Sequence, residues 1–323
     1  MKKVILDCIR RVVGTKHIDD KFNNIEYNLQ ENLKLTSKIV NLSESLHSTV
    51  SGISISEGIR LAIKAADDLA FFKCNLNGQI AWLPAATLRT MIHCVRSGNN
   101  QINVLVETAH INWMMQHLDS QKGQSLFVDV GSATGAASIP IALKFSKGVS
   151  IIAFEPATNA FFLFSESIKR NNIESVILTK SAVSDFVGQV EFVEYGEDST
   201  GNVPYLPEMS TISFSGVSNG NSNRINVDCV SLDEFFVNDK KINNNSFSSV
   251  VIKIDVEGFE EHVLNGAIKF IDQIRPYFSI DIHRRIGTNG TTEAECREIL
   301  SKFGYSFEKM GHVLLASPPN TNS

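Results

Sequence analysis

Acidic and basic side chains gather where two apolar segments of the sequence end, and they are of types that move protons or hold metal ions. They are Lys253, Asp255, Glu257, Asp281 and His283. Side chains alternate along a strand, so within each segment these residues share one side if the strand extends that far. The carboxyl ends of neighbouring parallel strands border the crevice in which ligands bind. We therefore expect one polar cluster there, able to take a proton from a hydroxyl group or to hold a divalent metal.

Asp255 is our preferred base or metal ligand within this cluster. The further catalytic candidates are Glu257, Asp281 and His283. A charged Lys253 inside an apolar strand is costly unless an acid pairs with it, which predicts a contact with Asp255 or Glu257. Asp255 has an alternative role as the cap of the following helix, with Lys253 merely neutralising it. His283 has an alternative role as an ordinary surface residue, and the need for a metal stays open.

A strand-like segment runs into a glycine-containing turn at Asp129 to Gly135, ahead of a helical pattern. Glycines permit a sharp turn and the close approach of a ligand. A dinucleotide fold has G-x-G-x-x-G because a pyrophosphate rests on this turn, but here Ala133 and Ala136 follow Gly131 in that motif. The missing middle glycine argues against a pyrophosphate. S-adenosylmethionine carries no phosphate, so Asp129, Gly131 and Gly135 are the expected binding residues for its methionine end.

Glu155 follows the next apolar strand at its tip, where an acid accepts hydrogen bonds from both hydroxyls of a ribose. Its alternative role is that of a surface carboxylate ahead of a helix capped by Thr158 or Asn159. Ser181 and Ala182, after the third strand, are expected near the adenine. In the intervening helix, core packing is favoured over contact with the adenine for Phe161, Phe162 and Phe164.

Short apolar strands alternate with helical patterns from Ser125 onward, which is typical of a parallel sheet. The expected strands are Leu126–Val130, Ser150–Phe154, Val176–Thr179, Val250–Ile254 and Tyr277–Ile282. A helix near 293–303 and a hairpin over 305–316 complete the pattern. The predicted fold class is α/β, with a Rossmann-like, mostly parallel sheet that ends in an antiparallel hairpin.

We expect three regions in the chain of 323 residues. Residues 1–120 are predicted as a mainly helical extension or cap, residues 121–317 as the Rossmann-like domain, and residues 318–323 as a flexible tail. The expected elements of the first region are helices at Ser56–Lys73, Leu88–Val95 and Ile111–Leu118 and a strand at Gln79–Leu83. Within the second region, 189–195 is expected as the return arm of a hairpin. The polar stretch 196–224 is expected as an insertion loop that acts as a lid.

Composition and charge exclude several classes of protein. Hydrophobic residues make up 43% and charged residues 20%, which excludes a mainly disordered or collagen-like chain. A formal net charge of −5 without a long Lys/Arg run argues against a nucleic-acid partner. No stretch approaches the roughly 18 apolar residues of a membrane span, and the first residues are too polar for a signal peptide. Five scattered cysteines favour a reduced, cytoplasmic protein.

Several separated blocks resemble the FkbM family of methyltransferases. They are Val128-Asp129-Val130-Gly131 with Gly135, Phe154-Glu155-Pro156, Asn171, Ala182-Val183-Ser184-Asp185 with Gly188, Val230-Ser231-Leu232-Asp233, Ile252 to Glu260, Val263 to Ala267, and Arg275-Pro276. The resemblance covers roughly Trp113 to Ala316. It implies a class I methyltransferase fold, S-adenosylmethionine as cofactor and methylation of a hydroxyl oxygen. Two positions depart from the family: Ala133 stands where Asn is usual, and Asp281 where Glu is common.

We therefore expect an S-adenosylmethionine-dependent methyltransferase that acts on a hydroxyl of a small metabolite or sugar. Two alternatives from other classes stay open. One is a non-catalytic module that binds S-adenosylmethionine, and the other is a dinucleotide-dependent oxidoreductase, which Ala133 and the terminal hairpin disfavour. A homo-oligomer is compatible with the sequence.

Overall fold

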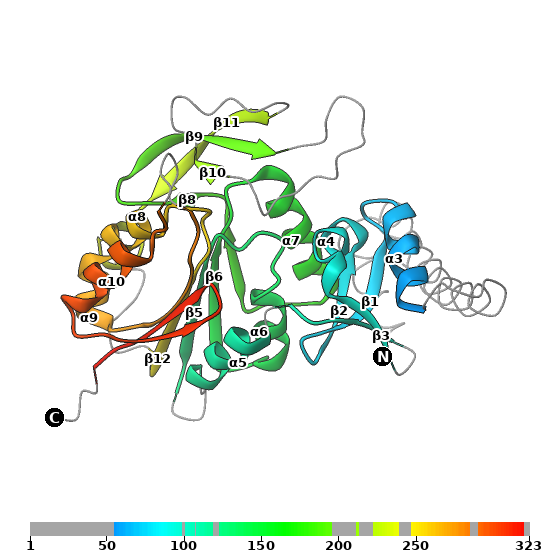
Figure 1. The fold of residues 1–323 in the computed structure, drawn as a ribbon, viewed down its shortest axis with the longest axis horizontal. Helices are drawn as coiled ribbons and strands as arrows, with labels where there is room; N and C mark the ends of the chain where they lie inside the picture. Colours follow the sequence, from blue (N-terminus) through cyan, green and yellow to red (C-terminus); the bar gives the residue numbers. More distant parts are fainter. Residues whose placement is uncertain are drawn as a thin grey trace, which may run out of the picture.

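The computed structural model describes residues 55–98, 101–106, 108–118, 123–195, 211–212, 222–238, 247–284 and 290–319. Most of the expected lid, 196–224, and the end of the expected tail, 320–323, lie outside these residues. The same holds for the first 54 residues, on which the signal-peptide argument rests. Figure 1 shows how the described elements are arranged.

A seven-stranded sheet forms the centre of the protein, in the order β14-β15-β13-β12-β5-β6-β7. Its parallel strands are β5 (Ser125–Val130), β6 (Val149–Phe154), β7 (Val176–Thr179), β12 (Ser249–Ile254) and β13 (Tyr277–Asp281). The strand β15 (Val313–Ser317) pairs antiparallel with both β13 and β14 (Ser306–Met310). The predicted α/β, Rossmann-like fold with a terminal hairpin is thus confirmed.

Helices cover both faces of this sheet, which explains why its central strands are apolar almost throughout. One face packs against α8 (Glu260–Asn265), α9 (Ile268–Ile274), α10 (Glu293–Ser301) and the π-helical segment Asp233–Asn238. The other packs against α5 (Thr108–His117) and α6 (Ser138–Lys144) (Figure 1). Alternate residues of β5 divide between the two cores, with Val128 facing the first and Phe127 the second. In the part of the chain that the structure describes, no helix has the length and apolar character needed to cross a membrane.

A second, four-stranded sheet lies at one end of the central sheet, in the order β10-β9-β11-β8 (Figure 1). Its strands are β8 (Ala182–Val183), β9 (Gly188–Tyr195), β10 (Thr211–Ile212) and β11 (Ser222–Val230). The strand predicted over 189–195 is present as β9. It is not the return arm of a hairpin with the preceding strand β8, since β11 lies between β9 and β8. The expected loop was also too long, because β11 already begins at Ser222.

The first described region departs from the mainly helical expectation, because it also contains a four-stranded sheet in the order β2-β1-β4-β3. Its elements are α3 (Ile55–Ala65), β1 (Phe71–Leu76), β2 (Gln79–Pro84), α4 (Ala85–Thr90), β3 (Val95–Gly98) and β4 (Gln101–Val104). The helix predicted to reach Lys73 ends at Ala65, shortly before Asp67 Oδ1 accepts the N–H of Leu69 at 3.1 Å. Such a local side-chain bond competes with helical hydrogen bonding. The helix predicted over Leu88–Val95 likewise ends early and gives way to β3.

This N-terminal region packs directly against the central domain. Its buried residues share one core with Ile139 of α6 and Phe164 of α7 (Thr158–Arg170). Asn171, at the end of α7, accepts the N–H of Trp82 and donates to the carbonyl of Trp82, both at 2.8 Å. The side chain of Asn171 therefore pairs with β2 much as a neighbouring strand would, and it ties the region to the domain.

Candidate active site

The turn after β5 contains two glycines that no larger residue could replace without movement of the backbone or of a packed ring. Gly131 has a φ of +77°, and a Cβ at this position would lie 1.9 Å from the carbonyl oxygen of Asp255. Gly135 has a φ of +87°, and its Cβ would lie 2.4 Å from the ring of Phe164. Glycine alone adopts such φ values freely. Gly131 thus brings the turn against the end of β12, where the polar cluster begins, and Gly135 brings it against the ring of Phe164.

Ala133 adopts a left-handed backbone, with a φ of +46°, at the position where a dinucleotide turn has its middle glycine. Asparagine and glycine tolerate this conformation better than alanine does. The N–H of Ala133 donates to Glu155 Oε2 at 2.7 Å. The turn therefore keeps its shape without the usual Asn, and its backbone reaches the acid at the end of β6.

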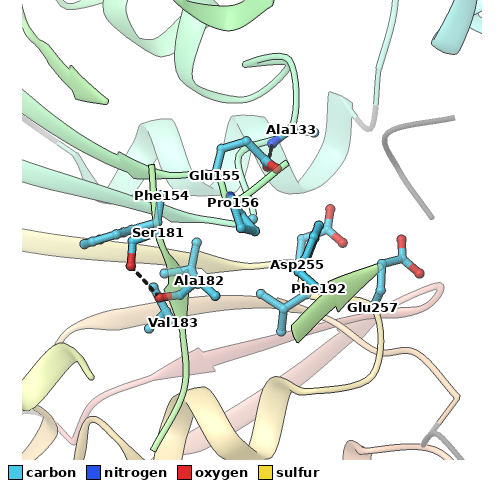
Figure 2. A pocket seen from close by; sticks show the side chains of 13 residues that line it. Ala133, Phe154, Glu155, Pro156, Ser181, Ala182, Val183, Phe192, Asp255 and Glu257 are labelled. Atoms are coloured by element: carbon cyan, nitrogen blue, oxygen red, sulfur yellow. Dashed lines mark hydrogen bonds between the residues drawn. The ribbon is translucent and has the colours of Figure 1, made fainter. Parts of the chain in front are cut away.

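A first cleft opens between this turn and the ends of β6, β8 and β12 (Figure 2). It contains about 640 Å³ of empty space, its open mouth included. The apolar residues of its wall are Val130, Phe154, Pro156, Val183, Phe192 and Val256. Ser181 and Ala182 lie on one side and the carboxylates of Asp255 and Glu257 on the other (Figure 2). The cleft thus combines an apolar wall with carboxylates at one end.

Glu155 lines this cleft and is only 5% exposed, so it is not the surface carboxylate of the alternative interpretation. Its two oxygens accept the N–H groups of Ala133 and Ala157, at 2.7 and 2.8 Å. Burial raises the pKa of Glu155 to about 7, against the effect of these two bonds, and the charges of Asp129 and Asp255 add to the rise. A carboxylate has about four lone-pair sites. Glu155 therefore keeps room to accept further hydroxyl donors.

Ser181 and Ala182, which were predicted to lie near the adenine, line the first cleft. The Oγ of Ser181 lies 2.8 Å from the carbonyl oxygen of Ala182 and 3.1 Å from that of Asp228, so its proton is engaged with the backbone. Phe192, on β9, was not predicted as a site residue. Phe192 and Val190 lie two residues apart, so a strand places both apolar side chains on one face, and this spacing was the signal that could have pointed to Phe192.

The aromatic residues of α7 differ from one another in their surroundings. Phe164 is fully buried in the core that α7 shares with the N-terminal region, as predicted. Phe162 is 47% exposed, so the prediction of core packing was wrong for this residue. Among the described residues that line the two clefts, Phe161, Phe162 and Phe164 are not found.

A second cleft adjoins the first and contains about 820 Å³ of empty space, its open mouth included. The residues common to both clefts are Gly131, Ala133, Asp255 and Glu257. The polar residues found in the second cleft alone include Asp129, Lys253, Asp281, His283 and His312. Three apolar residues that precede β5 in the sequence, Met91, Val106 and Ile111, also line it. The polar side chains that the strand ends were predicted to bring together therefore surround one space.

Lys253 and Asp255 form an ion pair, with Lys253 Nζ 2.7 Å from Asp255 Oδ2. The side chain of Lys253 is 8% exposed and that of Asp255 is 27% exposed. The predicted pairing of the buried lysine is therefore confirmed. Asp255 does not cap the next helix, since α8 begins at Glu260 and Phe259 takes the capping position.

His283 lies among carboxylates rather than on an open surface. Its Nε2 is 3.8 Å from Asp255 Oδ1 and 3.6 Å from Glu257 Oε1, and its Nδ1 is 2.9 Å from Glu260 Oε1. Burial lowers the pKa of His283, but the bond to Glu260 and the charges of Asp255, Glu257 and Glu260 outweigh it and raise the pKa to about 9. The imidazole is thus held between a buried carboxylate and the second cleft.

Glu257 has a left-handed backbone, with a φ of +53°. Residues held in such conformations cluster at functional sites. Burial raises the pKa of Glu257 to about 7; the charge of His283 opposes this rise, and those of Asp255, Glu260 and Asp281 add to it. Glu257 therefore changes its protonation near neutral pH, at the junction of the two clefts.

One ligand atom from each of Asp255, Asp281 and His283 lies within 4.8 Å of the others, a set that could hold a metal ion. Asp281 is 6% exposed, and its Oδ1 lies 3.4 Å from His312 Nε2. Hard divalent cations prefer such oxygen ligands. The ammonium of Lys253 already neutralises Asp255, which counts against a dication at this place.

All predicted site residues except Gly135 line one of the two clefts in the described part of the chain. Gly135 instead packs behind the turn, against Phe164. Asp129, fully buried, accepts a hydrogen bond from Ser138 Oγ at 2.6 Å and lines the second cleft. His312 was missed, although it opens the last strand of the predicted hairpin, beside β13.

Comparison with known proteins identifies the domain. A family model described as the methyltransferase FkbM domain matches residues 129–307, which is more than half of the chain. The chain belongs to the FkbM methyltransferase family. Among curated proteins, no match to this FkbM-family chain was found.

Solved structures of methyltransferases resemble this FkbM-family protein at low identity. Methyltransferase FkbM from Methylobacillus flagellatus KT is 17% identical with a TM-score of 0.39, over 60% of this chain and 43% of its own. Precorrin-6y C5,15-methyltransferase from Geobacter metallireducens GS-15 is 10% identical with a TM-score of 0.36, over 66% and 90%. A SAM-dependent methyltransferase from Aquifex aeolicus is 11% identical with a TM-score of 0.34, over 64% and 87%. The chain thus spans less than half of the first of these structures.

Proposed function

We propose that this FkbM-family protein transfers the methyl group of S-adenosylmethionine to a hydroxyl oxygen of a small metabolite or sugar. The observation that carries the proposal is that two clefts meet at Asp255 and Glu257. A cofactor in the first cleft and an acceptor in the second would meet at this junction. In-line displacement at a sulfonium requires such alignment of nucleophile, carbon and sulfur.

The first cleft suits the nucleoside part of S-adenosylmethionine, which family membership supports as the cofactor. Glu155 would accept the ribose hydroxyls, and the apolar wall around Phe154 and Phe192 suits an adenine. Asp129 and Gly131, at the turn, would hold the methionine end. The buried carboxylate of Asp129 supplies the negative charge that the ammonium of that end needs.

We propose that His283 Nε2, and not Asp255, is the base that takes the hydroxyl proton of the acceptor. Asp255 is less suited because its Oδ2 is already bound by Lys253 Nζ at 2.7 Å. An alcohol is a poor nucleophile while it keeps its proton. When bound, S-adenosylmethionine supplies the methyl carbon. Its methyl carbon would form a bond to the hydroxyl oxygen at the expense of its bond to sulfur, which would be left in a neutral thioether, and His283 Nε2 would take the hydroxyl proton.

The charges of the second cleft favour an acceptor without phosphate groups. The carboxylates are those of Asp129, Asp255, Glu257 and Asp281. They outnumber the basic groups, which are Lys253, His283 and His312. A nucleic acid or other polyanion would meet a repulsive field there. The apolar side chains of Met91, Val106 and Ile111 suit an uncharged acceptor with an apolar part.

The two alternative functions fit the site less well. A dinucleotide-dependent oxidoreductase would bring a pyrophosphate close to Ala133, whose methyl group stands where that motif has glycine. A non-catalytic binding module would need the first cleft alone. It would have no use for Glu257 and His283, whose pKa values of about 7 and 9 depart from their ordinary ones.

Calorimetric titration with three ligands tests the cofactor assignment. We expect S-adenosylmethionine and S-adenosylhomocysteine to bind more tightly than NAD, because the turn lacks the pyrophosphate glycine and retains the acid for the ribose. Tighter binding of NAD than of either methionine-derived ligand would refute the proposed function.

A further inference from the structure

Glu260 carries a fully buried carboxylate behind the second cleft, at the first residue of α8. A buried charge is costly unless other groups hydrogen-bond to it. Oε1 accepts the N–H of Gly258 at 3.0 Å and lies 2.9 Å from His283 Nδ1, and Oε2 accepts the hydroxyl of Thr292 at 2.6 Å. Three partners from three separate segments thus converge on one carboxylate that does not itself line either cleft.

Thr292 serves this carboxylate instead of the helix that it precedes. Thr292 occupies the capping position of α10, yet its side chain makes no capping hydrogen bond there. Threonine at this position ordinarily accepts a backbone N–H of the first helical turn. Here the hydroxyl donates to Glu260 Oε2, and the residue is fully buried. Because the Thr292 hydroxyl bonds to Glu260 and not to the helix, it helps to fix the position of the Glu260 carboxylate.

We propose that Glu260 is a positioning residue for methyl transfer, which holds His283 in the tautomer with its proton on Nδ1 and leaves Nε2 as the proton acceptor. The inference rests on the proposed function, in which His283 takes the hydroxyl proton. Glu260 touches neither ligand in this account and acts through the imidazole alone.

The chemistry of the two groups determines which nitrogen carries the proton. A carboxylate has no hydrogen to donate, so the proton in the short contact with Glu260 belongs to His283 Nδ1. In the neutral imidazole the lone pair then lies on Nε2. Nε2 is the nitrogen that faces Asp255 and Glu257, at the junction of the clefts. The N–H of Thr292 also donates to the carbonyl of His283 at 3.2 Å, which restrains the backbone of the same residue.

The ionisation of His283 responds to groups on several elements, and each bears on the test. The charged or titratable groups around it are Lys253, Asp255, Glu257, Glu260, Asp281 and His312. Glu260 is the one that makes a hydrogen bond to Nδ1. A change at Glu260 should therefore move both the pKa and the tautomer of His283, whereas the other groups act on the pKa by charge.

Two variants separate the hydrogen bond from the charge. Glu260→Gln keeps an oxygen to accept from Gly258 and His283 but removes the charge, so the pKa of His283 should fall while the tautomer is kept. Glu260→Ala removes the acceptor, so the Nε2–H tautomer should become populated. The matched control is Glu261→Ala, which removes the next carboxylate of α8, also buried. Nitrogen-15 NMR of the imidazole reports tautomer and pKa without any methyl acceptor.

We expect kcat to fall about 10–100-fold in Glu260→Ala, by analogy with residues that orient metal-binding histidines, with the KM for S-adenosylmethionine unchanged. The loss should be smaller in Glu260→Gln, with the alkaline rise of the pH profile moved to lower pH. Wild-type protein whose neutral His283 carries its proton on Nε2 would overturn the inference, as would a folded Glu260→Ala protein with wild-type kcat. If Glu260→Ala fails to fold, two variants of Thr292 replace it. Thr292→Val removes the hydroxyl that donates to Glu260 Oε2 and should lower kcat, whereas Thr292→Ser keeps that hydroxyl and should not. Absence of methyl transfer in the wild type would instead count against the proposed function.

Discussion

The carboxylate of Glu155 accepts the backbone N–H of Ala133 at 2.7 Å, so the acid at the end of β6 closes onto the turn that follows β5. The two features predicted to bind one cofactor are thereby joined to each other by a hydrogen bond. A ribose that binds to Glu155 will meet a carboxylate whose direction the turn already determines. The strength of cofactor binding should depend on this contact and on the ionisation of the acid.

Glu155→Gln should weaken the binding of S-adenosylmethionine at least about tenfold, since a hydrogen bond to a charged group is worth about 1.5–3 kcal/mol. Burial raises the pKa of Glu155 to about 7. The wild-type affinity should therefore increase as the pH rises through about 7 and the carboxylate ionises, and Glu155→Gln should lose this dependence. Calorimetry at several pH values measures both effects, with Glu174→Gln as an exposed control. Unchanged affinity in Glu155→Gln would remove Glu155 from the cofactor site.

Asp255→Asn should cost stability more than catalysis. It removes the carboxylate that neutralises the buried ammonium of Lys253, at a cost of about 1–3 kcal/mol for a pair that is partly exposed. Adding Lys253→Met should recover much of this loss in denaturant unfolding.

His283→Asn should instead lower turnover about 100-fold or more with its fold intact. Loss of turnover in Asp255→Asn alone, with wild-type activity abolished by chelator and restored by Mg²⁺, would show a metal site in place of the proposed base.

The pH dependence of turnover should follow His283. The ring must be neutral to accept a proton, and its pKa is about 9 in the free protein, so kcat/KM should rise with pH and level off above about 9. The bound sulfonium is a like charge that disfavours the imidazolium, so kcat should level off at a lower pH than kcat/KM does. A profile that is flat between pH 7 and about 10 would contradict the assignment of His283 as the base.

Ala133→Gly should stabilise the protein by about 1 kcal/mol, because alanine is strained at a positive φ and glycine is not. The matched control is Ala136→Gly, the same change three positions later, where no positive φ occurs. That control should lower stability by roughly 0.5–1 kcal/mol. Denaturant unfolding measures both, and an equal effect of the two changes would show that the strain at Ala133 is not real.

The sequence predicted the central sheet well because its strands are buried on both faces. Continuous apolar runs such as 126–130 and 250–254 have few competing interpretations when helical patterns separate them. Strand alternation then brought Lys253 and Asp255 to the same side, and the observed ion pair follows from that geometry. The polar cluster was therefore predictable from local pattern alone.

The N-terminal sheet was harder to predict because its strands are short and only half buried. Asn77 and Gly78, with φ of +47° and +89°, form the two-residue turn between β1 and β2 and were the strongest local signal. The role of Glu260 could not be predicted from its neighbours in the sequence, because its partner Thr292 lies 32 residues away. Met91, Val106 and Ile111 join the second cleft only through packing between distant segments.

Transfer of a labelled methyl group tests the central claim most directly. Cell extract would be incubated with the protein and S-adenosylmethionine carrying an isotopically labelled methyl group, and its compounds examined by mass spectrometry. We predict that a small compound without phosphate gains one labelled methyl on a hydroxyl oxygen, and that His283→Asn slows this gain about 100-fold or more. The account would be contradicted if the label appeared on nucleic acid, or on a nitrogen or carbon atom. It would also be contradicted if the protein bound S-adenosylmethionine but no compound gained the label.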